Sequence, residues 1–293
     1  MANETSATGG TTGSDPRISV VIPTRHRDGQ LATCLEALRP QLEGARAEVI
    51  VSDDGTSGET RAMLERSFPF ARWTQGPRRG PAANRNNGVA IARGELVVLV
   101  DDDVVPAPDF LANYVAAVSD DVDVYEGRTT CAAGVDSPLM HSPVNETGGY
   151  LWSCNLMLPR ALFQALGGFD EDFPYPHLED VAFRERLKGA GARVRFVPGA
   201  VVDHPPRPVA SAQAVGRQHE SYFLYCYRYL GRAPAKQVFF GDMLRHRVNL
   251  IAHKPLGRDS VVSLRDFVVE MAHVWRHWAE WDKKWRARAA KAG

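Results

Sequence analysis

Residues 94–110 read GELVVLVDDDVVPAPDF, and this stretch decides the fold. Five apolar residues, Leu96 to Val100, run directly into three aspartates, Asp101, Asp102 and Asp103. A short β-branched run of this kind is typical of a strand that is buried on both faces of a parallel sheet. Because three adjacent carboxylates repel one another, their place at the end of a buried strand needs an explanation.

The segments around this strand alternate between strand and helix patterns. Two more β-branched runs predict strands, ISVVIPT (18–24) and AEVIVSDDG (47–55). Apolar residues at helical spacing predict helices within 28–41, 57–68 and 78–94. Strands that alternate with helices imply βαβ units, so the fold class is α/β, with a mainly parallel sheet flanked by helices.

The composition is that of an ordinary globular protein with a sizeable core. Of 293 residues, 44% are hydrophobic and 24% are charged. Lys+Arg and Asp+Glu both number 35, so the net charge gives no reason to expect a nucleic-acid partner. No apolar run approaches the roughly 20 residues of a membrane span. Four scattered cysteines are too few for a disulfide scaffold, which favours reduced thiols in a cytoplasmic protein: Cys34, Cys131, Cys154 and Cys226.

Polar side chains stand at the ends of all three predicted strands: Thr24 and Arg25, Asp53 to Gly55, and the three aspartates. In open α/β sheets, ligands bind outside the carboxyl ends of the strands. Acids there can also simply cap helices, but three polar strand ends on one edge favour a site. Clustered aspartates suit Mg²⁺ or Mn²⁺, which keep open positions for phosphate. The cluster therefore predicts a metal and a diphosphate.

Four motifs occur in the order expected of a known family: VVIPTRHR (20–27), VIVSDDGTSGET (49–60), the segment 79–111 that contains the three aspartates, and GGFDEDFPYPHLEDVAFRERLKGAG (167–191). In these motifs the chain resembles the family 2 glycosyltransferases from about Ile18 to His204. The resemblance implies a GT-A fold, a Rossmann-like, mainly parallel sheet, here with a helical C-terminal extension. We expect a disordered tail at 1–16, which lacks the pattern of a signal peptide. A catalytic domain would follow at 17–205, with nucleotide-binding (17–105) and acceptor (106–205) halves, and a helical region at 206–293.

The resemblance also implies an activity and a set of partners. A metal-dependent, inverting hexosyltransferase would move a sugar from a UDP- or GDP-linked donor to a hydroxyl of a glycan, a lipid-linked molecule or a small molecule. Its cofactor would be Mn²⁺ or Mg²⁺. The nucleotide-binding residues implied are Pro23, Thr24, Arg25, Asp54, Arg85, Asn86 and Asp102. Those implied for the metal are Asp101, Asp103 and His204, although His204 could equally be a packed or surface histidine.

Inverting transfer needs a base that takes the proton of the acceptor hydroxyl. By resemblance, Asp180 is this base, and Glu179 next to it, at the start of a helix, is a hydrogen-bonding partner of the acceptor or the donor sugar. Acids at a helix start are also favourable for the helix dipole alone. Trp152 is a weaker candidate for contact with a sugar ring, since aromatic residues more often belong to the core. Asn155 is another weak candidate, because the resemblance implies a polar residue near the substrate at its position.

The C-terminal third has no counterpart in the resemblance. Residues 211–232 are aromatic and basic and predict a helix. A second predicted helix has an apolar stripe at three- and four-residue spacing: Leu264, Phe267, Val268, Met271, Trp275, Trp278 and Trp285. The stripe could pack on the catalytic domain, form a homodimer or lie on an anionic membrane as a peripheral contact. Packing or dimerisation is the interpretation we favour.

Three other readings fit parts of the sequence. DDDVV also matches the signature of haloacid-dehalogenase-type phosphatases, but there the motif ends the first strand of the domain. A sugar-1-phosphate nucleotidyltransferase should have a glycine-rich phosphate loop after strand one, and PTRHRDGQ is not such a loop. A non-catalytic nucleotide-sugar binding module would need neither the metal cluster nor the Glu-Asp helix.

Overall fold

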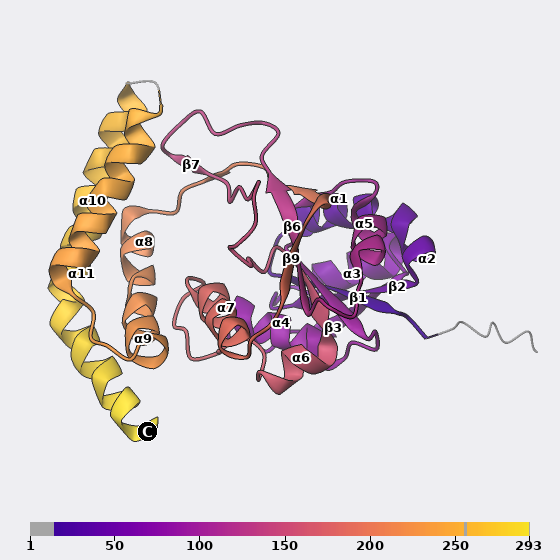
Figure 1. The fold of residues 1–293 in the computed structure, drawn as a ribbon. Coiled ribbons are helices and arrows are strands. Elements are labelled where there is room, and N and C mark those ends of the chain that lie inside the picture. The colour runs from indigo at the N-terminus through magenta and orange to yellow at the C-terminus, as the bar shows by residue number, and fades with distance from the viewer. Residues whose placement is uncertain (1–14, 255–256, 293) are drawn as a thin grey trace, which may run out of the picture.

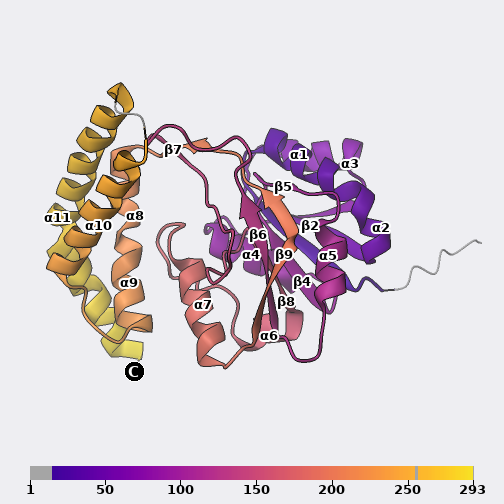
Figure 2. The ribbon, with the colours of Figure 1, turned by 45° about the horizontal axis from the view of Figure 1, so that its top comes forward.

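A computed structural model describes residues 15–254 and 257–292 of the chain (Figure 1). All but two residues of the predicted disordered tail, 1–16, lie outside the described residues. An α/β unit with one large sheet forms most of the chain, and a group of helices stands beside it (Figures 1 and 2). None of the helices within the described ranges is both long and apolar enough to cross a membrane.

The large sheet has eight strands in the order β3-β2-β1-β4-β8-β6-β9-β5. On one side of the sheet the pairs β1·β2, β2·β3 and β1·β4 are parallel. The alternation of strands and helices predicted the parallel pairing of β1, β2 and β4, but it did not predict β3. On the other side β8 runs antiparallel to both β4 and β6, while β6 and β9 are parallel. The bounds are β1 Ile18–Thr24, β2 Ala47–Asp53, β3 Ala71–Gln75, β4 Leu96–Val100, β5 Val105–Pro106, β6 Val124–Thr130, β8 Asn155–Pro159 and β9 Val194–Asp203.

Helices cover both faces of the sheet. One core cluster combines inward residues of β1 and β4 with α1 (Asp28–Leu38), α3 (Glu59–Ser67) and α5 (Phe110–Ala117). The opposite cluster holds the alternate strand residues, such as Val21, Val97 and Leu99, against α4 (Pro81–Ala90), α6 (Arg160–Ala165) and α7 (Glu179–Gly189). All five residues of β4 are buried, because the strand meets helices on both faces. This confirms the prediction from the apolar run.

Small elements complete the α/β unit. A 3₁₀ turn (Arg39–Gln41) and α2 (Leu42–Ala45) lead from α1 to β2. Two short strands, β7 (Met140–His141) and β10 (Arg207–Pro208), pair antiparallel to each other. They tie the long loop after β6 to the segment after β9, next to the carboxyl ends of the strands.

The C-terminal region is helical, as predicted, with α8 (Ala212–Gln218), α9 (Glu220–Tyr229), α10 (Lys236–Ala252) and α11 (Arg258–Ala292). In Figures 1 and 2, α8 and α9 lie between the long helix α11 and the α/β unit, and α10 runs along the outside. A third hydrophobic cluster fills this region and also includes Phe173 and Ala182. Since residues before 205 share that cluster, the boundary at 205/206 stays a prediction.

The prediction that packing covers the whole apolar stripe of α11 is partly wrong. Trp278 and Trp285 are buried, but Leu264, Val268 and Trp275 are 46%, 66% and 62% exposed. The face that packs on α8 and α9 instead carries Val274, Trp278, Trp281 and Trp285. This buried face also holds polar residues, among them Glu270, which bonds to His219 at 2.7 Å and to Arg247 at 2.9 Å. A sequence pattern that considers only apolar residues therefore did not identify the buried face of the helix correctly.

Candidate active site

The three aspartates lie at the carboxyl end of β4, beside the ends of β1 and β2. The parallel register between β1 and β2 pairs Thr24 with Asp53, so both strands stop at the same edge. The Thr24 hydroxyl donates a 2.7 Å hydrogen bond to Asp102, which is only 4% exposed. Burial raises the pKa of Asp102 to about 6, against the opposing pull of Arg27 and Thr24.

Asp101, Asp103 and His204 form a group whose ligand atoms all lie within 4.8 Å of one another. His204 follows β9 and reaches Asp103 because β5, just after the aspartates, pairs with the end of β9 (Val105 with Asp203). The imidazole is 1% exposed, its Nδ1 lies 3.2 Å from the Pro205 carbonyl, and its Nε2 lies 3.4 Å from Oδ1 of Asp103. A carbonyl can only accept, so Nδ1 carries the proton and Nε2 presents a lone pair when the ring is neutral.

These three residues fit a divalent cation. The Oδ1 atom of Asp103 is buried and accepts no hydrogen bond within the described residues, although a buried carboxylate oxygen normally has a partner. Two carboxylates and one imidazole form a donor set that suits Mn²⁺ and is compatible with Mg²⁺. The second ring nitrogen of His204 is held by a backbone carbonyl, as is common for metal-bound histidines.

Two arginines that the sequence reasoning did not select neutralise the aspartates. Arg27 lies 3.1 Å from Asp102 and 2.9 Å from Asp103, and Arg207 lies 2.8 Å from Asp103. Their side chains are 42% and 46% exposed, so both guanidinium groups can also reach solvent or a ligand. Arg27 is part of the PTRHR motif, which was a usable signal. No sequence signal linked Arg207 to the aspartates, because it lies more than a hundred residues after Asp103 in the chain.

A second carboxylate group faces Asp101 across a buried arginine. Arg85 is 6% exposed, lies 2.6 Å from Asp101 and 3.5 Å from Glu179, and stacks over the ring of Phe169. Burial opposes ionisation of Asp101, but the Arg85 guanidinium outweighs it and holds its pKa below the ordinary value. Burial, with Asp180 next to it, raises the pKa of Glu179 to about 7. Burial likewise raises the pKa of Asp180.

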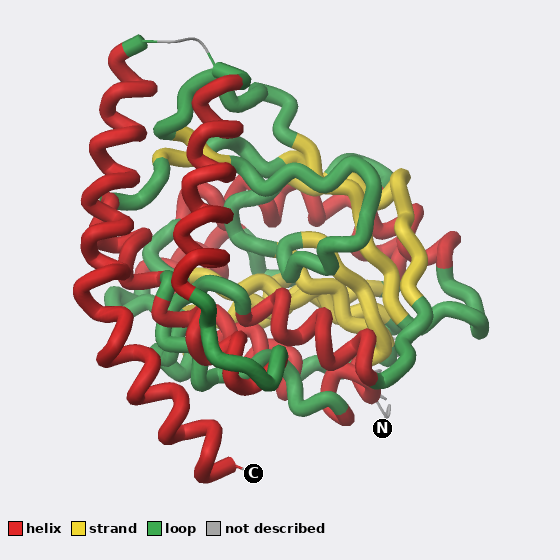
Figure 3. The backbone as a smooth tube through the Cα atoms, turned by 60° about the vertical axis from the view of Figure 1, so that its left-hand side comes forward, coloured by secondary structure: helices red, strands yellow, loops and turns green. Residues whose placement is uncertain are grey.

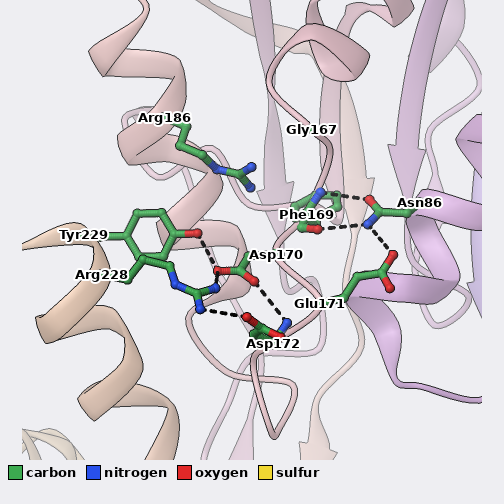
Figure 4. Close-up of a pocket in the computed structure, with 9 residues that line it drawn as sticks. All are labelled: Asn86, Gly167, Phe169, Asp170, Glu171, Asp172, Arg186, Arg228 and Tyr229. Atoms are coloured by element: carbon green, nitrogen blue, oxygen red, sulfur yellow. Dashed lines mark hydrogen bonds and ion pairs between the residues drawn. The ribbon is translucent and has the colours of Figure 1, made fainter. Parts of the chain in front are cut away.

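The segment that precedes α7, around residues 169–172, is held in place from two directions. Leu178, the residue before Glu179, has a φ of 71°, a left-handed conformation that is uncommon for a leucine. On one side, the amide of Asn86 in α4 bonds to the backbone N–H and C=O of Phe169 and to Glu171. On the other side, Arg228 and Tyr229 of α9 both bond to Asp170 (Figure 4). The helical region thus contacts the segment that precedes α7, and the residues in these contacts line the pocket in Figure 4.

The predicted nucleoside residues lie together at the ends of β1 and β2. Pro23, Thr24 and Asp54 are buried, and Arg25 is exposed beside them. Oδ1 of Asp54 accepts a 2.8 Å bond from the backbone N–H of Arg78. Asn84 of α4 was missed by the sequence reasoning. Its buried amide donates to the carbonyls of Thr24 and Ser52, which fixes both strand ends relative to the helix.

Three predicted residues lie outside this group or serve the framework. Asn86 holds the 169–171 segment through the bonds described above. Asn155 is 2% exposed, accepts a 2.6 Å bond from Tyr114 and donates to the carbonyls of Arg128 and Ala200, so the structure does not bring it to the metal group. Trp152 is half-buried, with its ring 4.5 Å from that of the exposed Tyr150.

The loop that carries these two aromatic residues depends on one buried acid. Glu126 in β6 is 1% exposed and accepts bonds from Asn145 and from the backbone N–H groups of Gly149, Tyr150 and Leu151. Four donors on one carboxylate fix the course of the loop beside the sheet edge. The sequence offered no sign of this role.

Comparison with known proteins identifies the family. The family model described as "Glycosyl transferase family 2" matches residues 19–164. The chain is 30% identical over 209 residues to a pre-mycofactocin glycosyltransferase of Mycobacterium tuberculosis H37Rv, covering 65% of this chain and 43% of the relative. It is 28% identical over 227 residues to a validoxylamine A glucosyltransferase of Streptomyces hygroscopicus subsp. limoneus, covering 62% and 50%. The chain thus spans about half the length of the curated relatives it matches.

Solved structures share the fold. A mannosyltransferase from Pyrobaculum calidifontis, PcManGT, solved with GDP-Man and Mn²⁺, superposes with a TM-score of 0.54 at 20% identity, covering 95% of this chain and 81% of that one. Residues 1–349 of S. aureus TarS superpose with a TM-score of 0.53 at 18% identity, covering 89% and 72%. At these identities the likeness establishes the GT-A fold.

Proposed function

The chain belongs to the family 2 glycosyltransferases and has their GT-A fold, and from this premise we propose that it transfers a sugar from a nucleoside-diphosphate donor to a hydroxyl acceptor, with inversion and with a divalent cation. One observation carries the proposal. The group formed by Asp101, Asp103 and His204 lies at the strand ends, and buried Arg85 joins its Asp101 to Glu179, which is next to Asp180 at the start of α7. A metal site and a base are the two parts that such a transfer needs.

We assign Asp101, Asp103 and His204 to the cation. When bound, the cation supplies positive charge to the leaving diphosphate. Asp102 and Thr24, which are bonded to each other, would face the ribose, and Asp54 would accept from the base. Both uracil and guanine offer an N–H to a carboxylate, so these residues admit UDP- and GDP-linked donors alike.

We assign Asp180 as the base that takes the proton from the acceptor hydroxyl as its oxygen attacks the anomeric carbon. The raised pKa of Asp180 brings its proton affinity closer to what a general base needs at neutral pH. Glu179, bonded to Arg85, would orient the donor sugar or the acceptor. Trp152 and Tyr150, on the loop fixed by Glu126, offer an aromatic surface for a sugar ring.

Nucleotide binding tests the metal assignment. In wild-type protein, Mn²⁺ should tighten the binding of UDP or GDP in a calorimetric titration. Asp103→Ala should abolish that tightening while the melting temperature shows a folded protein, and Asp120→Ala, at an exposed aspartate, is the matched control. Tightening of wild-type size in Asp103→Ala would refute the metal assignment.

Turnover tests the base separately. Asp180→Asn should leave donor affinity near wild type and reduce transfer, or slow donor hydrolysis, by about 10²–10⁴-fold. Glu185→Gln, on the same helix but paired with Arg184 on its far side, is the control and should remain active. A reduction of only a few-fold in Asp180→Asn would assign the base elsewhere.

A further inference from the structure

The outer side of the α10–α11 pair exposes an unusual amount of apolar surface. Among the described residues, twelve large hydrophobic side chains are exposed, and seven of these lie on these two helices. Isolated exposed apolar residues are normal, but such a concentration marks an interaction surface. Figure 3 shows both helices on the outside of the molecule. The seven residues are Val238, Leu244, Val248, Val261, Leu264, Val268 and Trp275.

Four of them form a continuous stripe on α11. Val261, Leu264, Val268 and Trp275 follow one another at intervals of three, four and seven residues, which places them on one face of a helix. Trp275 meets Phe240 of α10 at 5.7 Å between ring centroids. Leu244 and Val248 lie one and two turns beyond Phe240 on α10, so they continue the apolar surface across the neighbouring helix.

Basic residues border this stripe. Arg265 and Arg276 directly follow Leu264 and Trp275, and Arg258 and Lys283 continue the same row at seven-residue spacing. All four are exposed. The charge of the whole region agrees, because residues 206–293 contain 16 Lys and Arg against 7 Asp and Glu, while residues 1–205 contain 19 against 28. The C-terminal region is therefore net positive, and four of its exposed basic residues lie beside the apolar stripe; of these, Arg265 also pairs with Asp266 at 2.7 Å.

We propose that this outer face of α10 and α11 binds in the plane of an anionic lipid membrane. An interfacial helix buries an apolar stripe at the level of the acyl chains and sets basic residues against the headgroup phosphates. An exposed tryptophan such as Trp275 suits this boundary, because its ring is apolar and its N–H is polar. A second copy fits less well, because a two-fold dimer through this face would bring two rows of arginine and lysine together.

Vesicle sedimentation tests the proposal. Wild-type protein should bind vesicles of phosphatidylcholine with phosphatidylglycerol, bind phosphatidylcholine alone far more weakly, and lose binding as salt is raised. The double change Val268→Ser with Trp275→Ser should reduce the partition coefficient by at least about tenfold. The double change Arg265→Gln with Arg276→Gln should remove the preference for anionic vesicles. Val194→Ser, at an exposed valine of β9, is the control and should bind like wild type.

Two further measurements keep the outcomes distinct. Melting temperatures of the variants should stay within a few degrees of wild type, because the changed side chains are exposed. Light scattering should give a monomer for wild type. Failure of wild-type protein to bind anionic vesicles would overturn the proposal, as would a wild-type dimer that the serine variant dissociates. None of these measurements depends on sugar transfer, so the proposed function can fail or stand independently.

Discussion

Replacing both Arg27 and Arg207 by glutamine should make the metal group bind Mn²⁺ more tightly in the absence of nucleotide. In the structure, these two guanidinium groups lie 2.8–3.1 Å from the carboxylates of Asp102 and Asp103. They supply positive charge that a cation would otherwise supply. A cation that joins the group must therefore displace them or tolerate their repulsion.

The size of the effect follows from distance and exposure. Two unit charges about 3 Å apart interact by about 1.4 kcal/mol in water and by about 5.5 kcal/mol at an effective dielectric constant near 20. Both arginines are nearly half exposed, so the lower figure applies, and about 1 kcal/mol each is the expected gain. Together the two changes should lower the Kd for Mn²⁺ by about tenfold to thirtyfold.

With a nucleoside diphosphate bound, the double variant should bind Mn²⁺ more weakly than wild-type protein does. The diphosphate brings negative charge that Arg27 and Arg207 can accept once the cation occupies the carboxylates. Wild-type protein should then show strong mutual dependence of Mn²⁺ and nucleotide binding, and the double variant should lose most of it.

Calorimetric titration of Mn²⁺ into free and UDP- or GDP-saturated protein measures both quantities. Arg193→Gln, which removes an exposed ion pair with Asp123 elsewhere on the surface, is the matched control. An unchanged or weaker Mn²⁺ affinity in the double variant without nucleotide would refute the reasoning. So would an equal effect of Arg193→Gln.

Three other predictions concern buried or partly buried groups. Arg85→Leu leaves Asp101 and Glu179 without their cation and should lower the free energy of unfolding by about 3–5 kcal/mol near pH 7. Because the pKa of Glu179 is raised to about 7, this acid is protonated near pH 5, and denaturant titrations should show a smaller loss there; an equal loss would contradict this. Glu126→Ala should lower the free energy of unfolding by at least about 3 kcal/mol, because four donors of the 145–151 loop lose their acceptor. Limited proteolysis should then cleave this loop before the rest of the chain. Burial lowers the pKa of His177 to about 4, so the unfolded chain takes up a proton on this residue at a higher pH than the folded chain does. The free energy of unfolding should therefore be unaffected by this group above about pH 6.5 and should fall by up to about 3 kcal/mol toward pH 4. His177→Phe should reduce the dependence of the denaturation midpoint on pH across that range, and an unchanged dependence would assign it to other groups.

Local patterns in the sequence were sufficient to predict the elements that are buried on all sides. A five-residue β-branched apolar run indicates a strand with both faces covered, and β4 occupies those five residues. The aspartates that follow it were identified because they are adjacent in sequence to the strand that positions them. The acids at the start of α7 were selected through the resemblance, because acids at a helix start are common without a functional role. The resemblance added the order of motifs, which a single DDD could not supply.

Tertiary structure alone decided which distant residues meet. His204 and Arg207 reach Asp103 through the pairing of β5 with β9, a register that no local pattern encodes. Asn155 looked like a substrate contact, but the crossing of β6, β8 and β9 uses its amide inside the sheet.

The same division applies to α11. The spacing of its apolar residues predicted both the helix and its amphipathic character, because helical spacing is local. Trp275 and Trp278 are only three residues apart, so either could belong to the buried face. The choice depends on where α8, α9 and α10 lie around the helix, and their packing buries Trp278 and leaves Trp275 62% exposed. Burial is a property of the neighbours that a side chain meets, and those neighbours are brought together only by the fold.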